Sequence, residues 1–189
     1  MANLVYKQQL PKITSVRFNA QQFYDFSHRV FDDAIVAANQ FIAWEATVFA
    51  VHVYLDADPS LNIAGFYEKL ASVQATKQQI VDIYNEALRL KSEWDSNLSV
   101  AEKYVQQLKS VLIYQPEISA KKNKELQEAA MYANCPEVFD FYTFCESTVT
   151  WMKAVLTAFD RKLDVVESAN ANLARQINVT ELLSMRGLL

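Results

Sequence analysis

Few side chains in this sequence belong to the types that perform catalysis or bind metals. Glu45 and His52 lie seven residues apart, roughly on one face of a helix, where a carboxylate and an imidazole can act as an acid and a base. The same spacing also suits a hydrogen-bonded polar pair inside a helical bundle, and we favour that interpretation. The other histidine, His28, has no partner at a spacing typical of metal ligands.

The cysteines and glycines exclude further classes of site. Cys135 and Cys145 are not combined with histidines at metal-ligand spacing, and they flank a predicted helix start ten residues apart, which argues against a disulfide between them. Gly65 and Gly187 are the only glycines, so the chain cannot form the glycine-rich loops that bind nucleotide phosphates. We therefore expect a protein that is not an enzyme and that holds no cofactor and no metal.

One basic cluster is a candidate nucleic-acid contact. Lys121, Lys122 and Lys124 follow the aromatic Tyr114, and lysines near an aromatic ring can bind single strands through phosphate contacts and base stacking. Three nearby glutamates and a net charge of −4 oppose such binding, because phosphate neutralisation calls for a basic face. A solvated helix face is the alternative interpretation of this cluster.

The dominant pattern of the sequence is a stripe of apolar residues stepped alternately by three and four. Such a repeat keeps one face of a helix against a partner along a supercoil, and it predicts a helix over 60–114. At about 1.5 Å per residue the stripe is roughly 75 Å long. Lys77 and Lys91 interrupt it, and we expect their stems to lie along the seam with the ammonium groups in water. The other members are Ile63, Phe66, Leu70, Val73, Ile80, Tyr84, Ala87, Trp94, Leu98, Ala101, Val105, Leu108 and Leu112.

A second stripe of the same kind predicts the last helix, over 137–186, which Gly187 can end. Asn170 is a polar residue within it, and a buried asparagine in such a seam fixes register and strand number at a cost in stability. Both stripes are candidate seams between copies of the chain. The second consists of Tyr142, Cys145, Val149, Met152, Leu156, Phe159, Leu163, Val166, Asn170, Leu173 and Ile177.

The N-terminal residues 1–18 lack the helical pattern of the rest of the chain. Pro11 breaks any helix, and the run 13–18 is alternating and rich in β-branched residues. These features predict an extended N-terminal arm, which packs on its own domain or reaches a neighbouring subunit. A partly ordered terminus is the alternative.

A further helix is predicted over 20–55, with Asn19 as its N-cap. Its second half, 41–55, is apolar on every side, which is typical of a helix surrounded by others or by lipid. The stretch is short for a membrane span and contains Glu45 and His52, so we favour burial by other helices, including those of other subunits.

Prolines and polar residues set the remaining boundaries. Asp58 and Pro59 suit the cap and the first position of the long heptad helix. Pro116 ends that helix and precedes a short one predicted over 117–133. Asp95–Asn97 is a weak point in the long helix, where a break would produce an antiparallel hairpin; we favour one continuous helix.

Two resemblances accompany these patterns. The heptad run "ASVQATKQQIVDIYNEALRLKSEWDSNLSVAEKYVQQLKSVL", residues 71–112, resembles the helical rods of bacteriophage virion proteins of the collar, fibre-attachment or decoration type. The segment "FCESTVTWMK", residues 144–153, is similar to the recombination mediators of T4-like phages, which are small helical oligomers that load a recombinase on single-stranded DNA. The acidic net charge departs from that second family.

Composition is consistent with a helical globular protein. Hydrophobic residues make up 51% of the chain and charged ones 21%, and two glycines and four prolines leave few turns. We expect an all-α, elongated bundle of heptad-patterned, coiled-coil-like helices, with 19–189 as one domain.

No signal peptide is visible, so we expect synthesis in the cytoplasm. The expected function is a structural or assembly protein that binds copies of itself and other structural proteins, within a virion and without a membrane; the alternative is a single-strand-binding, mediator-like oligomer.

Overall fold

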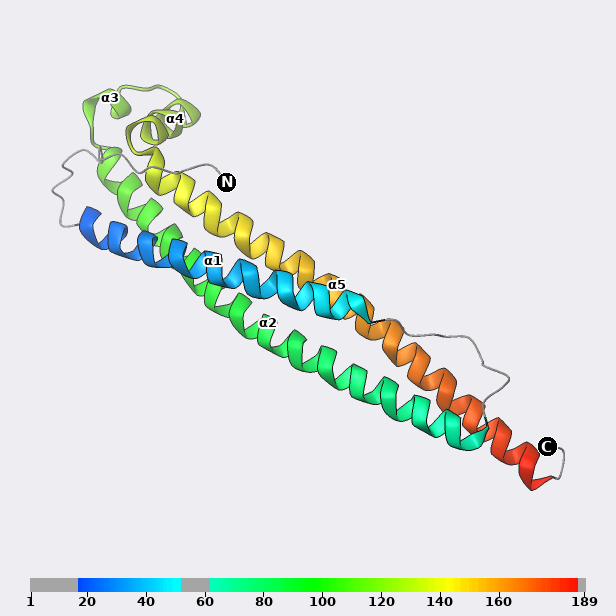
Figure 1. Cartoon of the computed structure of the whole chain (residues 1–189). Coiled ribbons are helices and arrows are strands. Elements are labelled where there is room, and N and C mark those ends of the chain that lie inside the picture. The colour runs from blue at the N-terminus through cyan, green and yellow to red at the C-terminus, as the bar shows by residue number, and fades with distance from the viewer. Residues whose placement is uncertain (1–16, 52–61, 187–189) are drawn as a thin grey trace. The chain divides into compact units, whose positions relative to one another are not determined.

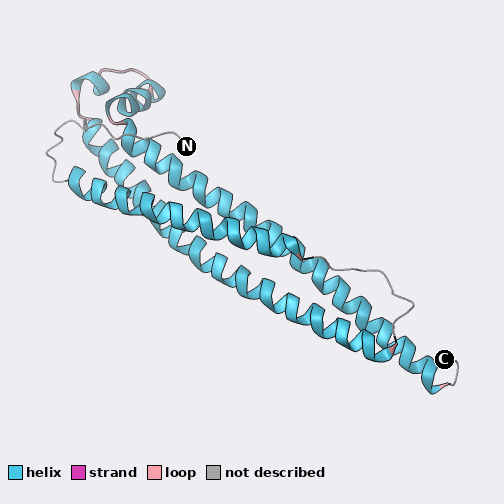
Figure 2. Ribbon diagram, viewed as in Figure 1, coloured by secondary structure: helices cyan, strands magenta, loops and turns pink. Residues whose placement is uncertain are grey.

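The computed structural model describes residues 17–51 and 62–186. Within them the chain forms five helices and no strand (Figures 1 and 2). The all-α prediction is therefore confirmed, whereas supercoiling of the long helices stays a prediction. The helices are α1 (Ala20–Ala50), α2 (Ile63–Leu112), α3 (Pro116–Ser119), α4 (Lys124–Asn134) and α5 (Pro136–Met185).

Asparagine side chains begin the first two helices. The Oδ1 atom of Asn19 accepts a hydrogen bond from the backbone N–H of Gln22 at 3.1 Å, which confirms the predicted N-cap of α1. The Oδ1 atom of Asn62 accepts in the same way from Gly65 at 2.9 Å. α2 consequently begins at Ile63, later than the predicted residue 60, because a capping side chain satisfies donors of its own helix.

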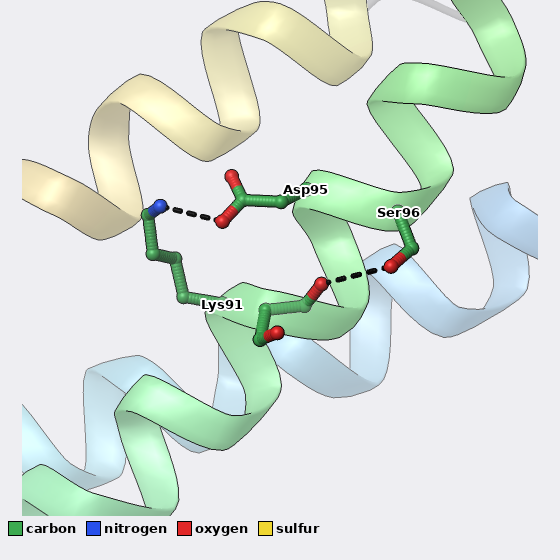
Figure 3. A network of polar contacts seen from close by, with 4 residues as sticks. Lys91, Asp95 and Ser96 are labelled. Carbon is green, nitrogen blue, oxygen red and sulfur yellow. Dashed lines mark hydrogen bonds and ion pairs between the residues drawn. The ribbon is translucent and has the colours of Figure 1, made fainter.

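α2 is continuous from Ile63 to Leu112, so the alternative of a hairpin broken at Asp95–Asn97 is wrong. At the predicted weak point, Lys91 Nζ lies 2.7 Å from Asp95 Oδ2, and Ser96 Oγ donates to the carbonyl oxygen of Ser92 at 3.2 Å (Figure 3). Both pairs are four residues apart, where side chains of a helix are neighbours. The local polar groups are thus satisfied without interrupting the helix, and Lys91 forms an ion pair in place of the predicted solvated ammonium.

The prediction of one continuous helix over 117–133 is wrong, because the chain forms two helices there, α3 and α4. Asn123 is extended and its side chain accepts from the N–H of Glu125 at 2.9 Å, which starts a new helix. Gln127 Nε2 donates to the carbonyl oxygen of Lys121 at 3.0 Å and holds the intervening turn. An N-cap in the middle of the segment therefore outweighed its helical composition.

α5 confirms the last predicted helix to within one residue at each end. Pro136 takes its first position, where the missing N–H costs no hydrogen bond. Cys135, the residue before it, is the C-cap of α4, so the two helices follow one another directly. The N–H of Cys135 donates to the carbonyl oxygen of Met131 at 3.2 Å.

Several predictions fall on residues outside the described ranges. They concern the arm over 1–16, the end of the first helix beyond Val51, the cap formed by Asp58 and Pro59, and Gly187. Where the structure does describe the first helix, it ends at Ala50. Over 17–51 and 62–186, no helix combines the length and the hydrophobicity that crossing a bilayer requires.

The helices divide into two compact units, and α1, α2 and α5 each contribute a segment to both. The first unit consists of residues 1–37 and 91–151, and therefore includes α3 and α4. The second consists of residues 38–90 and 152–189.

The core of the first unit is a cluster of aromatic rings from three helices. Phe23 of α1 is fully buried, with its ring centroid 5.5 Å from Tyr104 of α2 and 5.6 Å from Phe141 of α5. Phe31 lies 5.4 Å from Phe141 and 4.8 Å from Phe144. Edge-to-face and tilted contacts at these distances add to the energy of apolar burial. The cluster joins α1, α2 and α5 within this unit.

The second unit combines a mainly aliphatic core with polar links between α2 and α5. Lys77 Nζ lies 2.7 Å from Glu167 Oε1, and the Tyr67 hydroxyl donates to Glu181 Oε1 at 2.7 Å. The order of these pairs shows that α2 and α5 run antiparallel here. Lys77 thus meets a carboxylate, a contact that the sequence did not predict. The buried apolar residues are Phe41, Val48, Phe66, Val73, Ile80, Ala87, Met152, Val155, Leu156, Phe159, Val166, Ala169, Leu173 and Ile177.

Candidate functional site

The candidate catalytic residues do not form a site in the part of the chain that is described. Glu45 is half-buried on α1, and His52, its proposed partner, lies outside the described residues. His28 is exposed on α1. Among residues 17–51 and 62–186, no three His, Cys, Asp or Glu side chains gather in a way that could hold a metal ion.

Cys135 and Cys145 are free thiols in the interior of the first unit. Burial raises the pKa of Cys135 to about 11, with a further contribution from the charge of Glu137. Burial alone raises the pKa of Cys145 to about 12. The thiolate is the reactive form of cysteine, so both side chains are protonated and inert at neutral pH.

The predicted oligomer seams lie largely inside a single chain. Residues at seven-residue intervals from Phe66 to Leu108 on α2 are all buried, and so are those from Val138 to Leu173 on α5. These side chains form the chain's own core, so a surface for another copy has to be sought elsewhere. Of the predicted seam, Phe66, Val73, Ile80, Trp94, Val105, Leu108, Leu112, Met152, Leu156, Phe159, Val166 and Leu173 are buried, whereas Ile63, Leu70, Tyr84, Leu98, Leu163 and Asn170 are half-buried.

Asn170 carries a buried acceptor that is not satisfied. Its Oδ1 atom is inaccessible and accepts no hydrogen bond from the described residues. Leaving a buried polar atom unpaired costs about 1–3 kcal/mol. The unpaired Oδ1 atom is therefore consistent with the predicted cost of Asn170 in stability. The role of Asn170 in fixing register stays a prediction.

A run of exposed apolar residues lies along one face of α1, the helix drawn from blue to cyan in Figure 1. The exposed fractions are 64% for Ile35, 70% for Val36, 57% for Ile42 and 44% for Phe49. Small or polar residues, all exposed, lie between them. We call this face the α1 stripe; it consists of Ile35, Val36, Asn39, Ile42, Ala43, Ala46 and Phe49.

The α1 stripe is distinct from the face that α1 buries in its own chain. Val30, Ala37, Phe41 and Val48 are at most 2% exposed. α1 is therefore apolar on two faces, of which its own chain covers one and leaves the other exposed. The signal for this surplus in the sequence is the stretch that begins at Phe41, which is apolar on every side.

The lysine cluster lies on the surface of the first unit. Lys121, Lys122 and Lys124 are exposed, in the turn after α3 and at the first residue of α4. Within the described residues, no carboxylate forms an ion pair with these three ammonium groups. Tyr114, which is 76% exposed, lines an open concavity of about 400 Å³ together with Arg17, Ser110 and Val111.

No protein-family model, curated protein or solved structure matches the chain. The function is therefore argued from two surfaces, the α1 stripe and the lysine cluster.

Proposed function

We propose that this protein is a non-enzymatic structural or assembly protein that associates with copies of itself through an exposed helix face. The observation that carries the proposal is the α1 stripe. Its setting in a bacteriophage particle, beside other structural proteins, is supported by the resemblance of residues 71–112 to virion rods.

The physical argument concerns the cost of leaving the stripe in water. Burying apolar surface stabilises an association by about 25 cal/mol per Å². Contiguous apolar surface is a common mark of a protein contact, whereas single exposed apolar residues are normal. The α1 stripe repeats over successive turns of one helix, which is the arrangement that an interhelical contact needs.

Light scattering after size-exclusion chromatography tests self-association. We expect a mass above that of one chain, 21.6 kDa, over a series of protein concentrations. The mass should persist at moderate salt, because apolar burial is not screened by ions. Replacing Ile42→Lys should shift the protein towards the monomer, while the matched control Gln40→Lys, at an exposed α1 position outside the stripe, should not.

A monomer at every concentration, with the helical circular dichroism spectrum intact, contradicts the proposal. If the Ile42→Lys and Gln40→Lys variants both remain associated with equal masses, the self-association does not depend on the α1 stripe.

A second candidate function is binding of single-stranded nucleic acid. The exposure of Lys121, Lys122 and Lys124 without carboxylate partners favours it. Lysines release counterions when they bind phosphates, and an oligomer that repeats a weak site gains avidity. The glutamates of α3 and α4, which include Glu117 and Glu125, act against it.

Fluorescence anisotropy with a labelled single strand distinguishes this candidate. Affinity should fall steeply with salt and should be lost when the three lysines are replaced by glutamine. Replacing the exposed Lys103 and Lys153, which removes two charges instead of three, is the control and should have a small effect. The absence of binding at low salt eliminates the candidate.

A further inference from the structure

The α1 stripe has the spacing of a helix seam, which restricts what can cover it. Ile35, Asn39, Ile42, Ala46 and Phe49 are separated by four, three, four and three residues along one uninterrupted helix. A surface with this repeat is matched along its length by another helix with the same repeat. The small side chains of Ala43 and Ala46 allow the two backbones to approach closely.

Few other surfaces of the described chain can provide that partner helix. Exposed large apolar residues on α2 and α4 are single or paired side chains rather than a stripe. The end of α5 exposes Val179, Leu182, Leu183 and Met185, a run confined to the last turns of that helix. The α1 stripe spans about four turns at 3.6 residues per turn, so the surface that matches its length and spacing is the α1 stripe of a second copy.

Charge determines the direction of such a pair. Asp32 and Asp33 are exposed just before the stripe, and Glu45 is the only charged residue between Ala34 and Ala50. A parallel pair would bring the aspartates of both copies to the same level, where like charges repel. An antiparallel pair places them at opposite ends and also opposes the two helix dipoles. Antiparallel pairing is therefore favoured, and it makes the contact isologous.

We propose that the α1 stripes of two copies pack against each other, antiparallel, about a two-fold axis near Ile42. In this arrangement Ile35 of each copy lies near Phe49 of the other, since their numbers are equally distant from 42. The inference rests on the proposed self-association and adds to it the identity and the geometry of the contact.

Cysteine cross-linking in the full-length protein tests the geometry. Cys135 and Cys145 are buried, and burial raises the pKa of both thiols, so they react slowly and need not be removed. Under oxygen with copper–phenanthroline as the oxidant, Ile42→Cys should form a covalent dimer within minutes. Gln40→Cys, which is exposed on the same helix outside the stripe, should link at least tenfold more slowly.

A mixture of two variants determines the direction. Ile35→Cys and Phe49→Cys proteins, distinguished by a size tag, should link to each other in preference to themselves. Preferential linking of each variant to itself indicates a parallel pair and overturns the antiparallel geometry. Phe49 contacts Phe159, with ring centroids 6.5 Å apart, so the Phe49→Cys variant is first checked for an unchanged unfolding midpoint; Ala46→Cys, paired with Asn39→Cys, is the substitute if it has changed.

The outcomes separate this inference from the proposed function. An associated protein in which Ile42→Cys links no faster than Gln40→Cys overturns the α1 contact and leaves self-association in place. A protein that is monomeric by light scattering and forms no cross-link overturns both.

Discussion

The two units of this protein join the same three long helices by different means. In the first, the ring centroid of Phe141 on α5 lies 5.4 to 5.6 Å from those of Phe23, Phe26 and Phe31 on α1. In the second, a mainly aliphatic core packs between helices that are also linked by Lys77 and Glu167. Aromatic packing gains energy from the mutual orientation of the rings, whereas aliphatic packing depends mainly on buried area.

The α1 stripe draws its large apolar residues from both units. The second unit contains Ile42 and Phe49, two of the large apolar residues of the α1 stripe. Ile35 and Val36 of the same helix belong to the first unit. The stripe is therefore a property of α1 itself rather than of either core, and it is independent of how each core is built.

The largest expected effect is the loss of a ring from the first core. Phe141→Ala should destabilise the protein by about 3–5 kcal/mol, towards the upper end of that range because the ring contacts four other rings. The matched substitution Phe159→Ala, at an equally buried ring in the second unit, should cost less because fewer rings surround it. Urea unfolding followed by circular dichroism measures both. Equal losses would mean that ring orientation adds little to the first core.

Alkaline pH should lower the stability of the protein through the two buried cysteines of the first unit. The pKa values of Cys135 and Cys145 are raised in the folded state from an ordinary value of 9.0 to about 11 and about 12. Each buried thiol therefore contributes stability that is fully present below pH 9 and is lost as pH rises towards the folded-state pKa. The slope is about 1.4 kcal/mol per pH unit for each thiol while only the unfolded chain is ionised.

Urea unfolding between pH 8 and pH 10.5 checks this dependence. The Cys145→Ala variant should show a shallower decline than the native protein, although its stability at pH 8 is lower because of the smaller side chain. The tyrosines are unchanged in that variant and serve as an internal control. A slope unaffected by the substitution would contradict burial as the cause.

Removing the unsatisfied acceptor in the second unit should have a smaller, stabilising effect. Asn170→Leu should raise the free energy of unfolding by about 1–3 kcal/mol, because leucine has no buried polar atom to satisfy. The exposed Asn172→Leu is the matched control and should change it by less than about 0.5 kcal/mol. Light scattering on the same variant should show a broader distribution of oligomers, and an unchanged distribution would count against a role in register.

The smallest effect is expected from the ion pair between α2 and α5. Glu167→Gln should cost at most about 1 kcal/mol, since both partners are partly exposed, with side-chain exposures of 38% for Lys77 and 57% for Glu167. The loss should shrink at high salt. Glu86→Gln, which removes the local pair with Arg89 on α2, is the control and should cost less. A larger loss for Glu86 would show that cross-helix links do not distinguish the second unit.

The helical class and most helix positions follow from local patterns in the sequence. Periodicity over 60–114 and 137–186 predicted α2 and α5, because a repeat of three and four residues is a local property of a helix face. Asn19 identified the start of α1, since an N-cap acts within its own turn. The break that Asn123 introduces between α3 and α4 was missed because an asparagine is also common in loops.

Only the tertiary structure decided which apolar faces the chain covers itself. A heptad stripe requires a partner helix but carries no record of whether that helix belongs to the same chain, and here Phe66, Trp94 and Phe159 are buried internally. The same folding leaves Ile42 and its neighbours on α1 exposed. The sequence thus specified how much apolar helix surface there is to bury, and the packing of the three long helices specified which part remains exposed.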